Sequence, residues 1–199
     1  MNKQYHYSNF VDFEYDKYRF TQKWFHDNIA IKTELHKHID PTSKLNILEI
    51  GNFEGLSSCF LSDNYLEHSE SSLHCVDPFY LTGTVEGITC KCITEDTEKM
   101  FLENISKSKM SDKVEIYKMT SDYFFEKNDM KFDIIYIDGC HERDYIQRDI
   151  NNAFKCCNKG GIIWFDDYGG HCKNNFDEFL EPYDFDILYS SYQLGIKFK

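Results

Sequence analysis

The sequence predicts an α/β protein of the Rossmann-like class, with a mostly parallel seven-stranded sheet, a C-terminal antiparallel hairpin and helices on both faces. Short apolar runs of β type alternate with longer stretches of helical periodicity, which is the pattern of successive βαβ units. The run FDIIYID at residues 132–138 is almost wholly apolar, as expected for a parallel strand buried on both faces. The length of 199 residues suits one core, so a single domain is expected over residues 1–199.

The expected strands and helices alternate along the chain. Strands are expected at residues 45–50, 72–77, 114–119, 132–138 and 161–167, with two final runs at 185–191 and 193–199 forming the hairpin. A helical N-terminal segment (1–44, with its helix at 21–38) precedes the Rossmann-like core (45–199), whose helices are expected at 56–64, 95–106, 122–127, 142–157 and 175–180. The helix at 142–157 is expected to end in a left-handed glycine cap at Gly160 or Gly161, and residues 81–94 are expected to be irregular.

The acidic charge balance excludes several classes of partner. With 22 Lys and Arg against 34 Asp and Glu, the formal net charge is −12, and such a field repels nucleic acids and anionic membrane surfaces. No apolar stretch resembles a signal peptide or a membrane span. The eight cysteines show no paired spacing, so we expect a cytoplasmic protein with free thiols. The expected partner is a small molecule, and assembly into a homo-oligomer is left open.

A glycine-bearing turn follows the first expected strand and is the candidate cofactor site. Gly51 and Gly55 lie four residues apart, which lets the backbone turn tightly and approach a ligand without interference from Cβ atoms. In an open α/β sheet, ligands bind at the carboxyl ends of the strands, beside the switch point in strand order. Ser57 is placed to cap the next helix or to contact a cofactor carboxylate.

The residues around this turn favour S-adenosylmethionine over a dinucleotide. The GxGxxG fingerprint is absent because Phe53 stands where a pyrophosphate requires glycine, whereas S-adenosylmethionine has no phosphate. Glu49 is expected to interact with the amino-acid part of the cofactor or with the turn, and Asp77 with the ribose hydroxyls. Asp122 and Asp138 complete the set of candidate cofactor-binding residues. The alternative is that the glycines only shape a turn and that the aspartate after the second strand only caps it.

Three carboxylates are predicted to converge at the ends of the fourth and fifth strands. Asp138 ends the fourth strand, and Asp166 and Asp167 end the fifth. Neighbouring strands lie about 5 Å apart, so these like charges raise one another's pKa unless a cation neutralises them. Oxygen ligands favour a hard ion such as Mg²⁺, with Mn²⁺ or Ca²⁺ as alternatives. Such a metal would orient an acceptor hydroxyl for methyl transfer and lower the hydroxyl's pKa.

His141 stands three residues after Asp138 and is the candidate general base. Its unperturbed pKa is near neutral, which suits removal of a proton from an acceptor hydroxyl. The plainer interpretation is that the aspartates contact the cofactor or cap turns, and that the histidine hydrogen-bonds within its own loop. The catalytic candidates are therefore His141 and Asp138, and the metal candidates are Asp138, Asp166 and Asp167.

Three sequence elements occur together at a characteristic spacing. They are Leu48–Gly51 with Phe53–Gly55, Tyr136–His141, and Gly160–Gly161 through Phe165–Tyr168. Together they resemble a family of class I methyltransferases, the one grouped around sugar and small-molecule O-methyltransferases of the macrocin type. The Trp24-Phe25 and Tyr192-Gln193 segments are also similar, so the resemblance covers nearly the whole chain. Five parallel strands with a terminal hairpin is the sheet plan of that class.

The resemblance implies transfer of a methyl group from S-adenosylmethionine to a hydroxyl of a sugar, a glycan or another small molecule. In several members Mg²⁺ is held by acids that match the three aspartates named above. The chain departs from the family pattern at Arg143, where many members carry tyrosine, and has Tyr145 two residues further on. Asp149 matches the family and is expected to face a network on the sheet side of its helix.

Other classes of function predict features that the sequence lacks or contains only in part. A nucleotide-binding oxidoreductase predicts a third turn glycine and no carboxylate cluster. A non-catalytic scaffold with the cofactor fold, the main alternative to an enzyme, predicts broken cofactor positions, whereas the glycine turn is intact. A zinc protein would use Cys90, Cys92, His171 and Cys172, and their spacing fits no standard zinc site.

Overall fold

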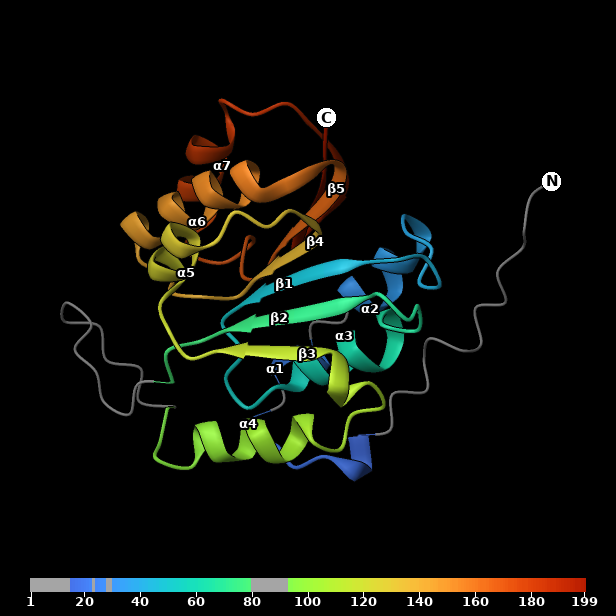
Figure 1. Ribbon diagram of the computed structural model, residues 1–199. Helices are drawn as coiled ribbons and strands as arrows, with labels where there is room; N and C mark the ends of the chain where they lie inside the picture. Colours follow the sequence, from blue (N-terminus) through green and yellow to red (C-terminus); the bar gives the residue numbers. More distant parts are fainter. Residues whose placement is uncertain (1–14, 23, 28–29, 80–92) are drawn as a thin grey trace.

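The computed structural model describes residues 15–22, 24–27, 30–79 and 93–199, and a sheet of seven strands forms its centre (Figure 1). The strands are β1 (Asn46–Ile50), β2 (Ser72–Val76), β3 (Val114–Tyr117), β4 (Phe132–Ile137), β5 (Cys157–Phe165), β6 (Phe185–Ser190) and β7 (Leu194–Phe198). Their order is β3-β2-β1-β4-β5-β7-β6, with β1 to β5 parallel and β7 antiparallel to both β5 and β6. The predicted Rossmann-like class and the C-terminal hairpin are confirmed.

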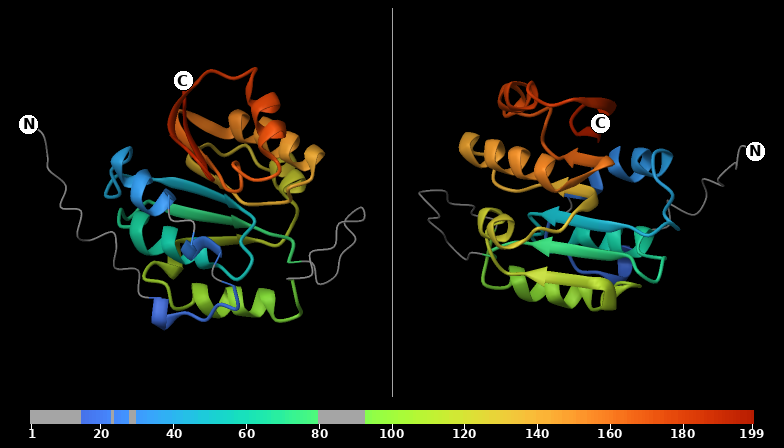
Figure 2. Two further views of the ribbon diagram at one scale, coloured as in Figure 1. Left: turned by 180° about the vertical axis from the view of Figure 1, so that it is seen from behind. Right: turned by 45° about the horizontal axis from the view of Figure 1, so that its top comes forward.

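Helices cover both faces of this sheet (Figure 2). One face carries α1 (Trp24–Asp27), α2 (Ala30–Glu34), α3 (Leu56–Tyr65) and α4 (Thr97–Ile105), and the other carries α5 (Ser121–Lys127), α6 (Arg143–Cys156) and α7 (Lys173–Leu180). Short 3₁₀ turns lie at Tyr15–Lys17, Leu35–Lys37 and Ser111–Lys113. Because side chains alternate along a strand, Ile47 packs with the first group of helices and Leu48 with the second.

The strand order changes direction at β1. This strand pairs in parallel with β2 on one side and with β4 on the other. The turns that follow β1 and β4 therefore leave the sheet side by side, and the backbone N–H of Asp138 donates to the carbonyl of Ile50 at 2.8 Å. Open α/β sheets bind ligands at such a switch point.

The N-terminal segment, where one helix was expected over residues 21–38, is helical in most of its described part. α1 covers Trp24–Asp27, and α2 (Ala30–Glu34) continues directly into the 3₁₀ turn at Leu35–Lys37. The backbone N–H of Ile31, at the start of α2, donates to the side-chain oxygen of Gln193 at 3.1 Å. The segment buries Phe25, Ile31 and Leu35 against the sheet.

The predicted glycine cap of the helix at 142–157 is wrong. The chain passes directly from α6 into β5, since Cys157 already has an extended conformation (φ −71°, ψ 136°) and pairs with Phe132. Gly160 does have a positive φ of 81°, but it lies inside β5. There the β4–β5 pairing is irregular between Phe132 and Ile134, and the extra residues of β5 are accommodated at that irregularity.

The segment expected to be irregular, residues 81–94, lies outside the described residues except for its last two positions. In the parts of the chain that are described, no helix combines the length and apolar character needed to cross a membrane.

Candidate functional site

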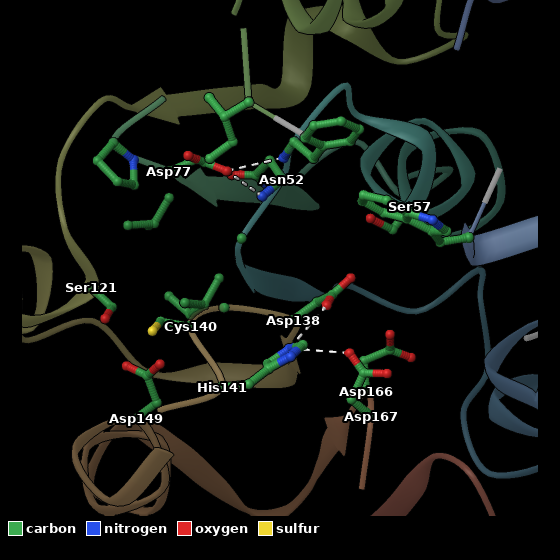
Figure 3. A pocket seen from close by; sticks show the side chains of 18 of the residues that line it. Asn52, Ser57, Asp77, Ser121, Asp138, Cys140, His141, Asp149, Asp166 and Asp167 are labelled. Atoms are coloured by element: carbon green, nitrogen blue, oxygen red, sulfur yellow. Dashed lines mark hydrogen bonds and ion pairs between the residues drawn. The ribbon is translucent and has the colours of Figure 1, made fainter. Parts of the chain in front are cut away.

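A cavity of about 690 Å³ lies at the carboxyl ends of the parallel strands (Figure 3). Its wall is made by the turns after β1, β2, β4 and β5, by the start of α5 and by the segment around α1. Its volume is in the usual range for small-molecule sites. The predicted site residues in the wall are Gly51, Phe53, Ser57, Asp77, Asp138, His141, Asp166 and Asp167. Glu49, Gly55 and Asp122 are not part of it.

The turn after β1 requires both of its glycines. Gly51 has φ +83°, and a Cβ atom on it would lie 2.0 Å from the carbonyl oxygen of Asp138. Gly55 has φ +84° at the N-cap of α3, and a Cβ atom there would lie 2.9 Å from the ring of Phe101. L-residues with side chains rarely adopt this backbone conformation. The two glycines therefore set a tight turn, and Gly51 leaves bare backbone at the cavity wall.

Aromatic side chains cover one side of this turn. Phe53 adopts a positive φ of 50°, and its ring stacks on Trp24 with the centroids 5.2 Å apart. Trp24 is 52% exposed, although it lines the cavity. A positive φ at a residue with a large side chain is uncommon and is found where the surrounding structure constrains the backbone. The α1 segment therefore forms part of the binding wall.

Asp77 anchors the β1 turn from the end of β2. Its Oδ2 accepts backbone N–H groups of Asn52 at 2.8 Å and Phe53 at 3.0 Å, and its Oδ1 accepts that of Phe79 at 2.7 Å. Burial raises the pKa of Asp77, while these backbone donors oppose the shift. An ionised carboxylate accepts about four hydrogen bonds, so one acceptor position remains for a ligand hydroxyl.

Glu49 supports the turn from behind the cavity wall. Its carboxylate is fully buried and accepts the hydroxyls of Ser57 and Ser58 in the first turn of α3. Burial raises its pKa to about 7, and the serine hydroxyls oppose this rise. Glu49 was expected to contact the amino-acid part of the cofactor or the turn, and the structure contains the contact with the turn region. The Ser57 hydroxyl donates to Glu49, so Ser57 helps to hold this turn in place.

The turns after β4 and β5 bring His141 between two carboxylates. Its Nε2 lies 3.1 Å from Oδ2 of Asp167 and 3.9 Å from Oδ1 of Asp138. Ligand atoms of these three residues all lie within 4.8 Å of one another. Figure 3 shows the three side chains pointing toward one another, two from the turn after β4 and Asp167 from the turn after β5. This cluster of Asp138, His141 and Asp167 is called the catalytic cluster below.

Asp166 is near the catalytic cluster but is directed elsewhere. Its Oδ1 accepts a hydrogen bond from Nε2 of Gln193, whose Oε1 accepts the indole N–H of Trp164 at 3.1 Å. Asp167 has a positive φ of 50°, and its Oδ1 accepts the hydroxyl of Tyr192. The turn after β5 therefore directs two adjacent carboxylates to different partners, Asp166 to the buried amide of Gln193 and Asp167 to His141.

The electrostatics of this region follow from buried like charges. Burial and the charge of Asp166 raise the pKa of Asp138 well above its ordinary value. Burial raises the pKa of Asp166 to about 6. The interaction with Asp138 raises the pKa of His141, burial opposes this rise, and the charge of Asp167 adds to it. A cation or a bound proton is therefore favoured between these carboxylates.

The other end of the cavity holds Asp149, which was expected on the sheet side of its helix but not among the site residues, and Ser121, which the sequence analysis did not single out. Asp122, a predicted cofactor residue, forms an ion pair with Arg148 at 2.9 Å and stays outside the wall. The wall at this end includes Ser121 and Asp149. Asp149 stands among the buried Ile146, Ile150 and Ala153 of α6. An acid on the apolar face of an amphipathic helix is the signal that could have identified it.

The zinc alternative gains no support from the described residues. Cys90 and Cys92 lie outside them, and the Cys172 thiol contacts the carbonyl of His141 at 3.4 Å. Cys59, Cys75, Cys140, Cys156, Cys157 and Cys172 are all free thiols, as predicted.

Comparison with sequences of known families matches residues 48–168 to a family described as "Methyltransferase domain". A protein of Acanthamoeba polyphaga mimivirus, described as uncharacterised, is 28% identical over 126 residues, which are 62% of this chain and 52% of that protein. The chain therefore spans about half the length of this curated relative.

Solved methyltransferases share the fold at low sequence identity. The O-methyltransferase TomG of Streptomyces achromogenes, involved in tomaymycin synthesis and solved with S-adenosylmethionine, is 15% identical, with a TM-score of 0.59 over 80% of this chain and 75% of its own. An O-methyltransferase of Thermotoga maritima is 13% identical, with a TM-score of 0.62 over 90% of this chain and 67% of its own. The pre-rRNA processing protein fibrillarin of Methanococcus jannaschii is 14% identical, with a TM-score of 0.53 over 80% of this chain and 69% of its own. These neighbours differ in what they act on, so the fold by itself does not select an acceptor.

Proposed function

The chain belongs to the family of methyltransferase domains, and it is an S-adenosylmethionine-dependent enzyme with the class I fold. We propose that it methylates a hydroxyl of a sugar, a glycan or another small molecule. A divalent cation at the catalytic cluster assists the reaction. The observation that carries the proposal is a single cavity that combines the glycine turn with a histidine between two carboxylates.

The residues present fit S-adenosylmethionine. Gly51 lines the cavity, and its lack of a side chain lets the turns after β1 and β4 lie against each other there. Asp77 retains an acceptor position for a ribose hydroxyl, and Phe53 stands where a pyrophosphate requires the second glycine of the GxGxxG fingerprint. When bound, the cofactor supplies an electrophilic methyl group on a sulfonium.

His141 is the residue best suited to take the proton of the acceptor hydroxyl. Its ring lies in the cavity wall, and Asp167 holds the Nε2 side at 3.1 Å. A carboxylate in contact with a histidine orients the ring and stabilises the imidazolium formed when a proton arrives. As the hydroxyl loses its proton to the histidine, its oxygen becomes the nucleophile for the methyl group. Asp138 stabilises the same positive charge from 3.9 Å.

The donor set of the catalytic cluster also fits a divalent cation. Two carboxylates and an imidazole lie close enough to share one ion. Carboxylates favour Mg²⁺ and Mn²⁺, and the imidazole shifts the preference toward Mn²⁺ and later metals. When bound, the ion would lower the pKa of an acceptor hydroxyl. With an ion on the histidine, the carboxylates would take over orientation of the acceptor.

We expect the two neighbouring aspartates after β5 to differ in cation binding. Asp167→Asn should weaken Mn²⁺ binding at least about tenfold, because it removes a charge from the catalytic cluster. Asp166→Asn should weaken it less, since the Asp166 carboxylate is hydrogen-bonded to Gln193. Calorimetric titration of each variant with Mn²⁺ measures both effects. Equal losses of Mn²⁺ affinity in the two variants would assign Asp166 as a ligand, as the sequence pattern predicted. Absence of Mn²⁺ binding by the wild type would contradict the proposed metal site.

The walls next to the catalytic cluster favour a neutral acceptor with an apolar face. Trp24 and Tyr192 line the cavity and are 52% and 41% exposed. Their rings offer flat apolar surface beside polar groups, as sugars and small hydroxylated rings require. The excess of acids in this region disfavours an anionic acceptor.

The proposal is tested by transfer of a labelled methyl group. The protein is incubated with S-adenosylmethionine carrying a deuterated methyl, with Mg²⁺ or Mn²⁺, and with a panel of sugars, nucleosides and phenols. An acceptor that gains the labelled methyl on oxygen supports the proposal. Methylation on nitrogen or carbon would contradict the hydroxyl assignment. Loss of the product in the His141→Ala variant, with binding of both the cofactor and Mn²⁺ retained, would support the histidine as the base.

A further inference from the structure

The cavity wall contains a buried carboxylate oxygen with no hydrogen-bond partner. Asp149 is 3% exposed, lines the cavity from α6, and its Oδ1 has no partner among the described residues. Its Oδ2 would lie 3.3 Å from a Cβ atom on Gly139, so the carboxylate rests against bare backbone after β4. Figure 3 shows the carboxylate beside Ser121 and Cys140, away from the catalytic cluster.

The neighbouring cation, Arg148, acts on the Asp149 carboxylate only through its charge, which lowers the pKa of Asp149. Arg148, the adjacent cationic side chain, pairs with Asp122 at 2.9 Å and lies over the ring of Tyr145 at 4.3 Å. Burial raises the pKa of Asp149 to about 6, the Ser121 hydroxyl opposes this rise, and the charge of Asp122 adds to it. A buried acceptor without a donor is costly. Such a group is expected where a ligand donor completes the hydrogen bonding.

We propose that Asp149, together with Ser121, recognises the 6-amino group of the cofactor's adenine ring. This inference rests on the proposed function. The 6-amino group is a donor and the adjacent ring nitrogen is an acceptor, so the base edge is complementary to a carboxylate beside a hydroxyl. The two residues lie apart from the catalytic cluster (Figure 3), as required if the base and the methyl group occupy opposite ends of one cavity.

The same arrangement makes Asp149 a specificity-determining residue. A deaminated base carries a carbonyl oxygen in place of the amino group and a hydrogen on the adjacent ring nitrogen, so the donor and the acceptor of this base edge exchange places. In the pose of the adenine ring the oxygen would face the carboxylate, and sites built around a buried polar group discriminate strongly against such analogues. Replacement of the carboxylate by a carboxamide supplies a donor for that oxygen.

The test compares two ligands that differ only at this edge of the base, S-adenosylhomocysteine and S-inosylhomocysteine, by calorimetry at pH 8. The wild type should bind the adenosyl compound at least about tenfold more tightly. Asp149→Asn should weaken the adenosyl compound about tenfold and bring the ratio of the two affinities close to one. The matched control is Asp144→Asn, an exposed carboxylate at the start of the same helix, which should keep the wild-type ratio.

Two outcomes would overturn the inference while leaving the proposed function in place. They are an unchanged ratio in Asp149→Asn and an equal loss of affinity for both ligands. Absence of binding of the adenosyl compound to the wild type would overturn the proposed function and this inference with it. If Asp149→Asn does not fold, Ser121→Ala provides the second variant. It should lose affinity for the adenosyl compound several-fold, and unchanged affinity would count against the inference.

Discussion

Replacement of Asp138 by asparagine is expected to reduce methyl transfer by about two to four orders of magnitude, the usual contribution of positioned acid–base groups. The change removes one of the two carboxylates around His141 while keeping the size of the side chain. It also removes a charge close to that of Asp166, which together with the loss of solvation raises the pKa of Asp138. The folded state should therefore persist, because removing one of several close like charges relieves their mutual repulsion.

The measurement is the rate of methyl transfer to the acceptor found in the labelling experiment, together with the thermal midpoint of each variant. Asp144→Asn is the matched control. It makes the same change in charge on an exposed residue at the start of α6 and should retain full activity. An Asp138→Asn enzyme with near wild-type activity and no need for a cation would contradict the role of the catalytic cluster.

Gly51→Ala is expected to destabilise the protein by about 3 kcal/mol or more, combining a strained backbone with overpacking. The added Cβ would lie 2.0 Å from the carbonyl oxygen and 2.6 Å from the carbonyl carbon of Asp138. These are backbone atoms of the turn after β4, so no side chain can move aside. The same displacement would deform the cavity wall, so any folded variant should bind S-adenosylhomocysteine at least about tenfold less tightly.

Gly160→Ala separates the two causes of this effect. Gly160 has nearly the same φ of 81°, but a Cβ atom there would meet nothing within 4 Å. The Gly160→Ala variant should therefore lose only about 1–2 kcal/mol of stability, the cost of a positive φ at a residue with a side chain, and should keep full cofactor binding. Urea unfolding of both variants measures the difference. Equal losses of stability would show that the contact with Asp138 is unimportant.

The sheet and the first turn were predictable because local patterns and global fold agree there. The carboxyl ends of the strands lie within two residues of their expected positions, although β5 begins four residues early at Cys157, and the apolar run of β4 is buried between two helical layers. Gly51 and Gly55 have the positive φ angles that a tight turn requires. Both depend on backbone chemistry that a sequence expresses directly.

The direction of individual side chains was not predictable, since it depends on partners far along the chain. Asp166 and Asp167 are adjacent in sequence, yet one meets Gln193 and the other His141. Asp122 was a predicted cofactor residue, but it forms an ion pair with Arg148 and does not line the cavity. Gln193, 162 residues from Ile31, accepts its backbone N–H, a contact that no local pattern expresses.

The central claim is that the cavity after β1 and β4 binds S-adenosylmethionine, and calorimetric titration with S-adenosylhomocysteine tests it most directly. With Mg²⁺ present, the account predicts one site per chain that binds in the wild type and is lost or much weakened in Gly51→Ala. Binding without Mg²⁺ should persist, since the cofactor and the cation occupy different groups of residues. No binding by the folded wild type in either condition would contradict the account and would favour a scaffold that keeps the fold without the reaction.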